Sequence, residues 1–334
     1  MAKLTEAEAR RVYNESIVIN GMVGTTYAFD VFEKTNQTAA VFTLAAHNED
    51  WNRAMELFKN YMAALIANHD KMILVESVDD IIRAKKENKF GMIFGFQTAT
   101  PIGMDWTNLW IMYKLGLRIM QLTYMNRTAC GDGCQEVNDM GLTRFGQQMI
   151  RVMNQVGVTL DLSHCGWKTA EDALKYTDRP VICSHSNPYA VCKNSGRRNL
   201  PDEIIKGIAE TGGVLGINGH PMICSTKPRN VRPDMSDYLD AMEYMIQIAG
   251  IDHVGIGPDL FHGFTRWEEE RWHVGGYLLD GGWRTTIGLE GEEGIPNIAV
   301  GLAERGYGEE EIKKIMGGNF LRVFGETWKP DVFK

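Results

Sequence analysis

The sequence predicts an α/β fold, specifically a (β/α)8 barrel of the TIM type. Two observations lead to this prediction: short apolar runs rich in β-branched residues recur along the chain, and amphipathic stretches with helical spacing separate them. The chain has 334 residues, of which 44% are hydrophobic. One barrel of roughly 250 residues with insertions accounts for that length. We therefore expect a single barrel domain over residues 1–334.

The expected strands are continuous apolar runs, a pattern typical of strands that are buried on both faces of a parallel sheet. Parallel neighbours need crossover connections, and the helical stretches between the runs would supply them. In chain order, we expect strands at Ser16–Gly21, Thr38–Leu44, Gly91–Gln97, Arg118–Tyr124, Val158–Ser163, Pro180–Ser184, Gly213–Asn218 and His253–Gly257.

The expected helices carry apolar residues at helical spacing. In residues 50–68, for example, Met55, Phe58 and Met62 fall on one face. A further helix near the N-terminus begins after Thr5, whose hydroxyl is suited to cap it. The clearest patterns cover Asp50–Asn68, Thr143–Val156, Trp167–Tyr176, Pro201–Thr211, Asp237–Ala249 and Glu309–Phe324.

An open, doubly wound sheet is the rival arrangement. No glycine-rich dinucleotide loop opens a helix after the first expected strand, which weakens this rival without excluding it. The longest irregular stretch runs from about residue 261 to residue 294 and is rich in Gly, Trp and charged residues. Long loops in compact domains are commonly functional, so we interpret this insertion as a lid.

Composition and charge exclude several kinds of partner. The formal net charge is −8 and no basic run is present, which argues against binding to nucleic acid. No window approaches the roughly 18 apolar residues of a membrane span, and the charged N-terminus is not a signal peptide. We therefore expect a cytoplasmic protein that does not bind membranes and that acts on a small molecule.

The cysteines do not form a recognisable framework. There are 6 of them in the chain, too few for a disulfide scaffold of this length, so reduced thiols are expected. Cys130 and Cys134 resemble half of a zinc knuckle. No second Cys or His pair follows at the spacing of a zinc finger, so a structural zinc ribbon is not expected.

Two histidines follow consecutive strands. The fifth expected strand leads into His164, and the sixth leads into His185. In a barrel the chemistry lies at the C-terminal ends of the strands, so neighbouring strands would bring both imidazoles within reach of one metal ion. The alternative is that each histidine caps its strand through hydrogen bonds. The matched positions favour the metal site.

Several motifs occur in an order that resembles the membrane (renal) dipeptidase family. The resemblance is continuous from about residue 90 to the C-terminus and weaker before that. It is carried by Val158–His164, Pro180–Asn187, Arg198–Glu203, Gly212–Gly216, His253–Asp259 and Gly317–Val323. The fold that this resemblance implies is the barrel of the metal-dependent hydrolases, and the family's assembly implies a homodimer.

The resemblance also implies roles for individual residues. His164 and His185 correspond to the histidines of the family's second metal site, which would hold zinc or a similar divalent transition metal. Arg198 corresponds to the arginine that holds the substrate carboxylate; it is preferred over Arg197 because Asn199 follows it directly. Asp259 corresponds to the catalytic aspartate that handles the proton on the scissile nitrogen.

Other positions depart from the family's pattern. Its strand-one His-x-Asp pair is replaced by Met22 and Gly24, its bridging glutamate by Gln97, and the histidine after strand four by Tyr124. Methionine, glycine and a neutral glutamine are poor partners for zinc. We therefore expect at most one metal per chain, with Gln97 and Tyr124 lining the substrate pocket instead.

Two histidines alone would hold a metal weakly, so the site needs further ligands or a tightly bound water molecule. Asp259 is the first candidate by position. The segment 130–136 offers Cys134 and Glu136, and its glycines permit tight turns above the barrel mouth. The alternative interpretation of this segment is a structured loop with a buried cysteine.

Three classes of function follow from these residues. The first is a metal-dependent hydrolase acting on a small amide, imine or dipeptide-like compound, in which classical dipeptidase activity is doubtful. The second is a lyase or other non-hydrolytic enzyme, because a fold does not fix the chemistry once the metal ligands have changed. The third is a catalytically inactive binder of a small acid or amine. Metal analysis separates the enzymes from the binder.

Overall fold

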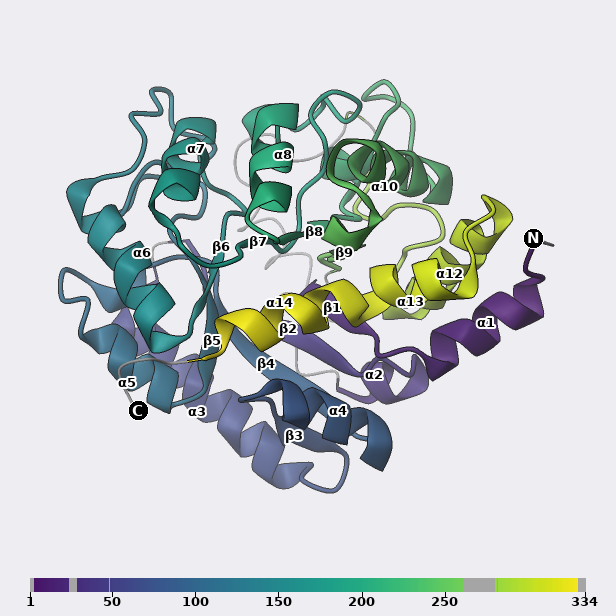
Figure 1. Cartoon of the computed structure of the whole chain (residues 1–334), viewed down its shortest axis with the longest axis horizontal. Coiled ribbons are helices and arrows are strands. Elements are labelled where there is room, and N and C mark those ends of the chain that lie inside the picture. Colours follow the sequence, from purple (N-terminus) through teal and green to yellow (C-terminus); the bar gives the residue numbers. More distant parts are fainter. Residues whose placement is uncertain (1–2, 24–28, 48, 261–279, 281, 330–334) are drawn as a thin grey trace.

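The computed structural model describes residues 3–23, 29–47, 49–260, 280 and 282–329. It contains a nearly closed barrel of parallel strands with helices around the outside (Figure 1). Along the barrel the strand order is β1-β2-β4-β5-β6-β7-β8-β9, and β1 packs beside β9. The predicted (β/α)8 barrel is therefore confirmed.

The strands agree with the predicted runs but are shorter at several C-terminal ends. β5, for example, ends at Gln121 rather than Tyr124. The sequence did not indicate β3, which pairs with β4 outside the barrel order. The strands are β1 (Ile19–Val23), β2 (Ala39–Ala45), β3 (Met72–Leu74), β4 (Phe90–Phe96), β5 (Leu117–Gln121), β6 (Thr159–Asp161), β7 (Ile182–Cys183), β8 (Val214–Ile217) and β9 (Val254–Ile256).

Most predicted helices are present, together with several shorter ones, but the stretch predicted as one helix at Glu309–Phe324 is divided. Helix α1 begins after Thr5 as predicted, because Thr5 and Glu8 form a reciprocal capping box. The helices are α1 (Glu6–Glu15), α2 (Asp30–Lys34), α3 (Trp51–Ala67), α4 (Val78–Glu87), α5 (Asn108–Lys114), α6 (Arg144–Val156), α7 (Trp167–Tyr176), α8 (Asp202–Glu210), α9 (Pro221–Cys224), α10 (Met235–Ala249), α12 (Ile295–Glu304), α13 (Glu309–Lys313) and α14 (Asn319–Thr327).

The predicted continuous helix 309–324 was wrong. A π-helical turn, Lys314–Gly318, separates α13 from α14, and the backbone is non-helical at Gly317. A Cβ atom at Gly317 would lie 2.3 Å from the carbonyl oxygen of Ile17. The chain bends here because the C-terminal segment packs directly against the backbone that leads into β1.

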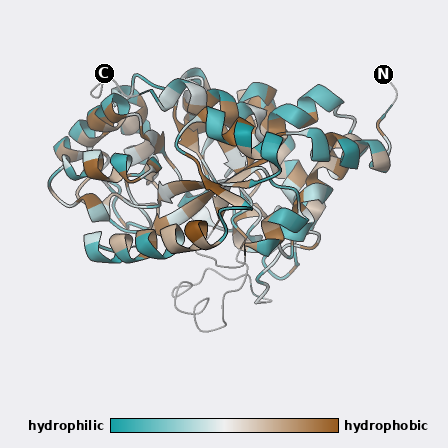
Figure 2. Ribbon diagram, turned by 90° about the horizontal axis from the view of Figure 1, so that it is seen from below, coloured by the Kyte–Doolittle hydropathy of each residue, from teal (hydrophilic) through white to brown (hydrophobic). Residues whose placement is uncertain are grey.

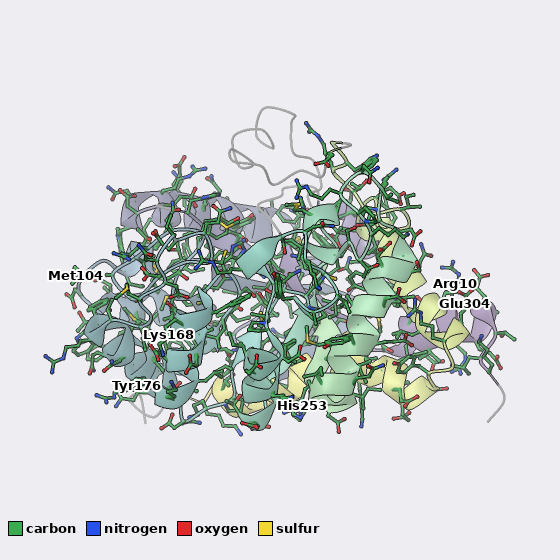
Figure 3. The ribbon with its side chains drawn as sticks, turned by 90° about the horizontal axis from the view of Figure 1, so that it is seen from above. Arg10, Met104, Lys168, Tyr176, His253 and Glu304 are labelled. Carbon is green, nitrogen blue, oxygen red and sulfur yellow. The ribbon has the colours of Figure 1, made fainter. Side chains whose placement is uncertain are left out.

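Apolar side chains fill the barrel and the layer between strands and helices. Figure 2 shows hydrophobic residues on the central strands and hydrophilic residues on the outward faces of the helices. Polar side chains project around the periphery, for example Lys168 on α7 (Figure 3). Most of the lid predicted at 261–294 lies outside the described residues, and its described part contains a 3-10 turn at Glu292–Gly294. None of the described helices is long and apolar enough to cross a membrane.

One buried carboxyl group lies away from the predicted site. Glu292 is fully buried and accepts hydrogen bonds from Gln37 (2.8 Å) and Asn20 (3.3 Å), while its Oε1 atom has no partner. Burial raises the pKa of Glu292 to about 7, although the two hydrogen bonds oppose this shift. The protonated form is therefore favoured in the folded state.

This carboxyl group predicts a pH-dependent stability. A raised pKa in the folded state gives stability that is complete below pH 4.5 and is lost as the pH rises through about 7. Glu292→Gln should therefore gain up to about 3 kcal/mol in unfolding free energy relative to the native protein between pH 5 and pH 8. Urea unfolding at both pH values measures this difference. The exposed neighbour variant Glu293→Gln is the control, and an equal effect of Glu292→Gln at both pH values would contradict the assignment.

Candidate functional site

The two strand-end histidines meet inside the barrel mouth. His164 follows β6 and His185 follows β7, and these strands are hydrogen-bonded neighbours. The Nε2 atoms of the two rings lie 2.9 Å apart. Both residues are buried, with 4% and 0% of their surface exposed. The structure thus brings together the pair that the sequence singled out.

The backbone around the pair is unusual. His164 and Asp259 both have positive φ angles, 63° and 55°. Such angles are uncommon outside glycine and occur often at functional sites. Gly257 follows β9, and a Cβ atom at this position would lie 1.9 Å from the carbonyl oxygen of Ser184. Glycine here lets the end of β7, and with it His185, approach the end of β9, two strands away in the barrel.

Both imidazoles are neutral. Burial lowers the pKa of His164 and of His185 well below 6.5, and the nearby Arg198 guanidinium lowers both further. The Nη2 atom of Arg198 lies 3.1 Å from His164 Nε2. Because a guanidinium can only donate, Nε2 of His164 must be the acceptor, and its proton must be on Nδ1. That Nδ1 atom is buried without a partner.

Arg198 lies at the centre of the site and is almost fully buried. Its Nη1 atom donates to Ser186 Oγ, and its Nη2 atom donates to the backbone carbonyl of His185 at 2.8 Å. Its Nε atom is buried and has no partner. Arg197 instead donates to the backbone carbonyl of Glu136. Of the two adjacent arginines, Arg198 is the one that contacts the histidine pair.

Asp259 follows β9 and is also buried. Burial raises its pKa to about 7, while Arg198 and a hydrogen bond from Asn218 oppose this shift. Asn218 Nδ2 lies 3.2 Å from Asp259 Oδ2. The same amide group lies 3.5 Å from the carbonyl oxygen of His185. Asn218 therefore connects the carboxyl group to the histidine pair.

An aromatic stack covers one side of the pair. The ring of Tyr124 stacks on His164, with centroids 4.0 Å apart and planes 19° apart. His47 lies against Tyr124 with a centroid distance of 4.2 Å. Removal from water and the nearby Asp259 raise the pKa of the Tyr124 hydroxyl, so this group stays protonated and can donate a hydrogen bond.

Neutral groups occupy the ends of strands β1 and β4. Gln97 Nε2 donates to Thr43 Oγ1 at 2.7 Å. Thr43 Oγ1 lies 3.1 Å from the carbonyl oxygen of Val23 and 3.3 Å from the sulfur of Met22. Gly24 lies outside the described residues. The described part of this region therefore contains a neutral hydrogen-bonded cluster instead of a carboxylate and histidine set.

The other proposed ligands do not join the pair. The Cys134 sulfur lies 3.6 Å from the sulfur of Met125, and a carboxylate oxygen of Glu136 accepts the backbone N–H of Arg127 at 2.7 Å. Within the described ranges, no group of three or more His, Cys, Asp and Glu side chains is placed to hold a metal ion. The described residues therefore supply two nitrogen ligands and no third ligand of these types.

Among the described residues, the two histidine nitrogens are the donors suited to a single metal ion. The unprotonated Nε2 atom of His164 lies beside the ring nitrogen of His185, and histidine nitrogens of this kind bind zinc or a similar ion. The guanidinium of Arg198 beside them and the missing third side chain limit the affinity. Around Met22 and Gln97, nothing in the described cluster supplies the anionic ligands that a second dication needs.

The sequence did not single out several residues of this site, three of which illustrate the reasons. Asn218, His47 and Ser186 contact predicted site residues but were not singled out. Asn218 could have been found, because it is the last residue of a predicted strand. No local pattern marks His47, whose place beside Tyr124 depends on how the loop after β2 folds over the barrel.

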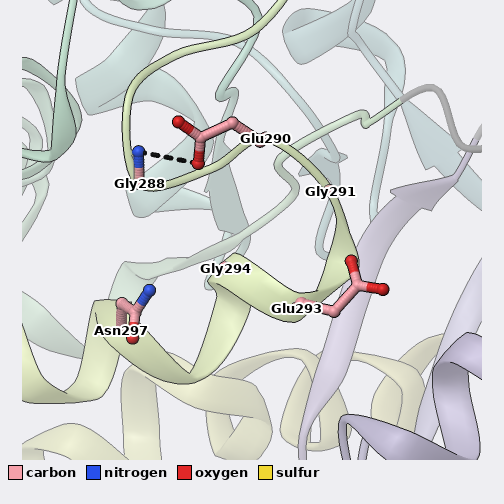
Figure 4. Close-up of a pocket in the computed structure, with 6 residues that line it drawn as sticks. All are labelled: Gly288, Glu290, Gly291, Glu293, Gly294 and Asn297. Atoms are coloured by element: carbon pink, nitrogen blue, oxygen red, sulfur yellow. Dashed lines mark hydrogen bonds between the residues drawn. The ribbon is translucent and has the colours of Figure 1, made fainter.

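A separate hollow of about 370 Å³ lies at the start of α12 (Figure 4). Its lining comes from the single stretch 288–297 and includes Glu290, Glu293 and Asn297. Glu290 accepts the backbone N–H of Gly288 at 3.0 Å. None of the predicted site residues lines this hollow, so we do not assign the chemistry to it.

Comparison with known proteins connects this geometry to one family. The model of the membrane dipeptidase family (peptidase family M19) matches residues 18–330. The dipeptidase tcpJ of Claviceps purpurea is 26% identical over 312 residues, which cover 93% of this chain and 68% of that protein.

Two solved structures have a similar fold. An amidohydrolase from Pseudomonas aeruginosa is 31% identical with a TM-score of 0.89, and the match covers 97% of this chain and 99% of that chain. A metallopeptidase from Rhodobacter sphaeroides, liganded with a phosphinate mimic of the dipeptide L-Ala-D-Ala, is 18% identical with a TM-score of 0.79. That match covers 94% of this chain and 100% of the other, and it supports the fold alone.

Proposed function

The chain belongs to the membrane dipeptidase family, and from this premise we propose that it hydrolyses a small dipeptide-like, amide or imine substrate with a single metal ion. Family membership makes it an enzyme of the dipeptidase and amidohydrolase type. The observation that carries the single-metal proposal is the 2.9 Å approach of His164 Nε2 and His185 Nε2 in a buried site.

The two histidines would hold zinc or a similar divalent transition metal. When bound, such an ion supplies Lewis-acid polarisation of a carbonyl group and acidifies a water molecule. The neutral state of both rings suits this role, because metal ligands must be deprotonated. The neutral cluster around Gln97 and Thr43 would leave space on that side for the substrate.

Asp259 would move the proton. Its pKa of about 7 allows the carboxylate to accept a proton from the attacking water and return it to the leaving nitrogen near neutral pH. Asn218 fixes one carboxylate oxygen through its hydrogen bond. Asp259 is therefore proposed as the catalytic base and not as a metal ligand.

Arg198 and Tyr124 would orient the substrate. The positive charge of Arg198 favours an anionic group, and its unpartnered Nε–H is the donor still available for one. The protonated Tyr124 hydroxyl can donate to a substrate oxygen. Gln97 would contact the substrate from the β4 side. The homodimer and the cytoplasmic location stay predictions.

The single-metal proposal predicts both stoichiometry and activity. Protein purified without chelator should contain at most about one transition-metal ion per chain by elemental analysis. Ordinary dipeptides should be hydrolysed well below the common enzyme rate of roughly 10 per second, because the second ion cannot be held. A panel of dipeptides, N-acyl amino acids and small amides, followed by release of free amine, identifies the better substrates.

Each outcome of this experiment separates the candidate functions. Two tightly held ions per chain, or rapid dipeptide turnover, would contradict the single-metal mechanism. Protein that binds no metal and hydrolyses nothing would support the small-molecule binder instead. Conversion of a substrate without uptake of water would support the lyase.

A further inference from the structure

We propose that Asp161 and Ser184 form a positioning relay that fixes His185 as its Nδ1–H tautomer. The relay would leave His185 Nε2 with a bare lone pair that faces His164. Neither Asp161 nor Ser184 contacts the paired Nε2 atoms directly, so both act through His185. The relay deepens the proposed function, since the metal would bind at the nitrogen that it exposes.

Asp161 is fixed as an acceptor of four hydrogen bonds. It is the last residue of β6 and is fully buried. Its Oδ1 atom accepts the backbone N–H groups of Ser163 (2.9 Å) and Ser184 (3.0 Å). Its Oδ2 atom accepts from Gln121 Nε2 at 2.9 Å and from Ser184 Oγ at 2.5 Å. The carboxylate therefore accepts a hydrogen bond from the hydroxyl group of Ser184.

That contact determines where the His185 proton lies. A serine hydroxyl has one proton, and Ser184 uses it toward Asp161. His185 Nδ1 lies 2.6 Å from the same hydroxyl oxygen. Nδ1 must therefore donate to Ser184, and a ring that carries one proton has it on Nδ1 and none on Nε2.

The relay determines the protonation of the two Nε2 atoms that face each other on His164 and His185. Arg198 donates to His164 Nε2, so that nitrogen is also an acceptor. Both Nε2 atoms are then unprotonated, and they lie 2.9 Å apart in a buried site. Two lone pairs repel at this distance unless a cation lies between them. The relay thus prepares the pair for a metal ion, as hydrogen bonds to the outer nitrogen of ligating histidines generally do.

Ser163 provides a matched control in the same location. Its hydroxyl is as buried as that of Ser184 and lies 3.2 Å from it. It accepts the backbone N–H of His185 at 3.1 Å, whereas the hydroxyl group that contacts the ring nitrogen is that of Ser184. Ser163→Ala therefore removes a buried hydroxyl at similar structural cost without breaking the link to Nδ1.

The first test measures the tautomer in metal-free protein. The 15N chemical shifts of the His185 ring distinguish the protonated nitrogen from the bare one. The native protein and Ser163→Ala should show the Nδ1–H form. In Asp161→Asn, an amide N–H would donate to Ser184, whose hydroxyl would then donate to His185 Nδ1 and drive the proton to Nε2. Gln121 can accommodate this exchange by turning its amide, because its Oε1 atom is unpartnered.

The second test measures zinc affinity by titration of the metal-free protein. Asp161→Asn and Ser184→Ala should each bind zinc about 10–100-fold more weakly than the native protein, and Ser163→Ala much less so. Melting temperatures of the three variants show whether they fold. Asp161→Asn is nearly isosteric and keeps the proposal testable if Ser184→Ala does not fold.

The two tests fail independently. Retention of the Nδ1–H form in Asp161→Asn would overturn the relay, whatever the protein does with zinc. If the native protein binds zinc, equal zinc affinity of Ser163→Ala and Ser184→Ala would also overturn the relay. Native protein with the expected tautomer but no zinc binding would contradict the single-metal function and leave the relay standing.

Discussion

Alanine in place of either His164 or His185 is expected to abolish metal retention. The Nε2 atoms of the two rings are only 2.9 Å apart, so both would ligate the same ion. Residues that act as a unit are not additive, so the double variant should lose little more affinity than either single variant. Metal content and zinc titration of the three variants measure this directly.

The structural alternative makes a different prediction. If the histidines only cap their strands, each variant should lose roughly 0.5–2 kcal/mol of stability, the losses should add, and metal content should not change. His253→Ala is a suitable control. The ring of His253, labelled in Figure 3, makes a hydrogen bond with the carbonyl oxygen of Gly213, and this residue belongs to no proposed site. Full metal occupancy in either single variant would remove the basis for the metalloenzyme proposal.

Asp259→Asn is expected to lower kcat by about 10²–10⁴-fold on the best substrate of the panel, because an amide cannot accept the proton. The exchange is nearly isosteric, and the amide oxygen can still accept the hydrogen bond of Asn218. Zinc affinity should change little, since Asp259 is proposed as a base and not as a ligand. Steady-state kinetics and zinc titration of the same preparation give both values.

A matched exchange elsewhere controls for the loss of charge. Asp252→Asn makes the same change at an exposed ion pair with Lys314, where no effect on kcat is expected. A variant Asp259→Asn that retains full activity would exclude this residue as the base. Loss of zinc together with loss of activity would instead make Asp259 a ligand, as its position in the sequence had first suggested.

Features that leave a periodic pattern in the sequence could be predicted, and features that depend on distant neighbours could not. Strands that are buried on both faces and helices with one apolar face leave periodic patterns, so the barrel was predictable. The pairing of His164 with His185 was predictable for the same reason, because consecutive parallel strands place their ends side by side. The short strand β3 and the bend at Gly317 were not, since each depends on a neighbour distant in sequence.

Loop side chains were the least predictable part of the site. Cys134 and Glu136 are ligand types in a suitable loop, yet their side chains contact Met125 and the backbone of Arg127. The direction of such side chains is decided by local contacts that no periodic pattern reports. The orientation of Arg198 was equally unpredictable, because its two Nη atoms donate hydrogen bonds to Ser186 Oγ and to the carbonyl oxygen of His185.

Residue identity and order were enough to predict the barrel, the family and the replacement of metal ligands by Met22, Gln97 and Tyr124. The hydrogen bonds that connect the site could be found only in the folded structure. It showed that Arg198 donates to His164 and that Ser184 joins Asp161 to His185. Proton positions follow from hydrogen bonds between strands, and those bonds exist only once the barrel has folded.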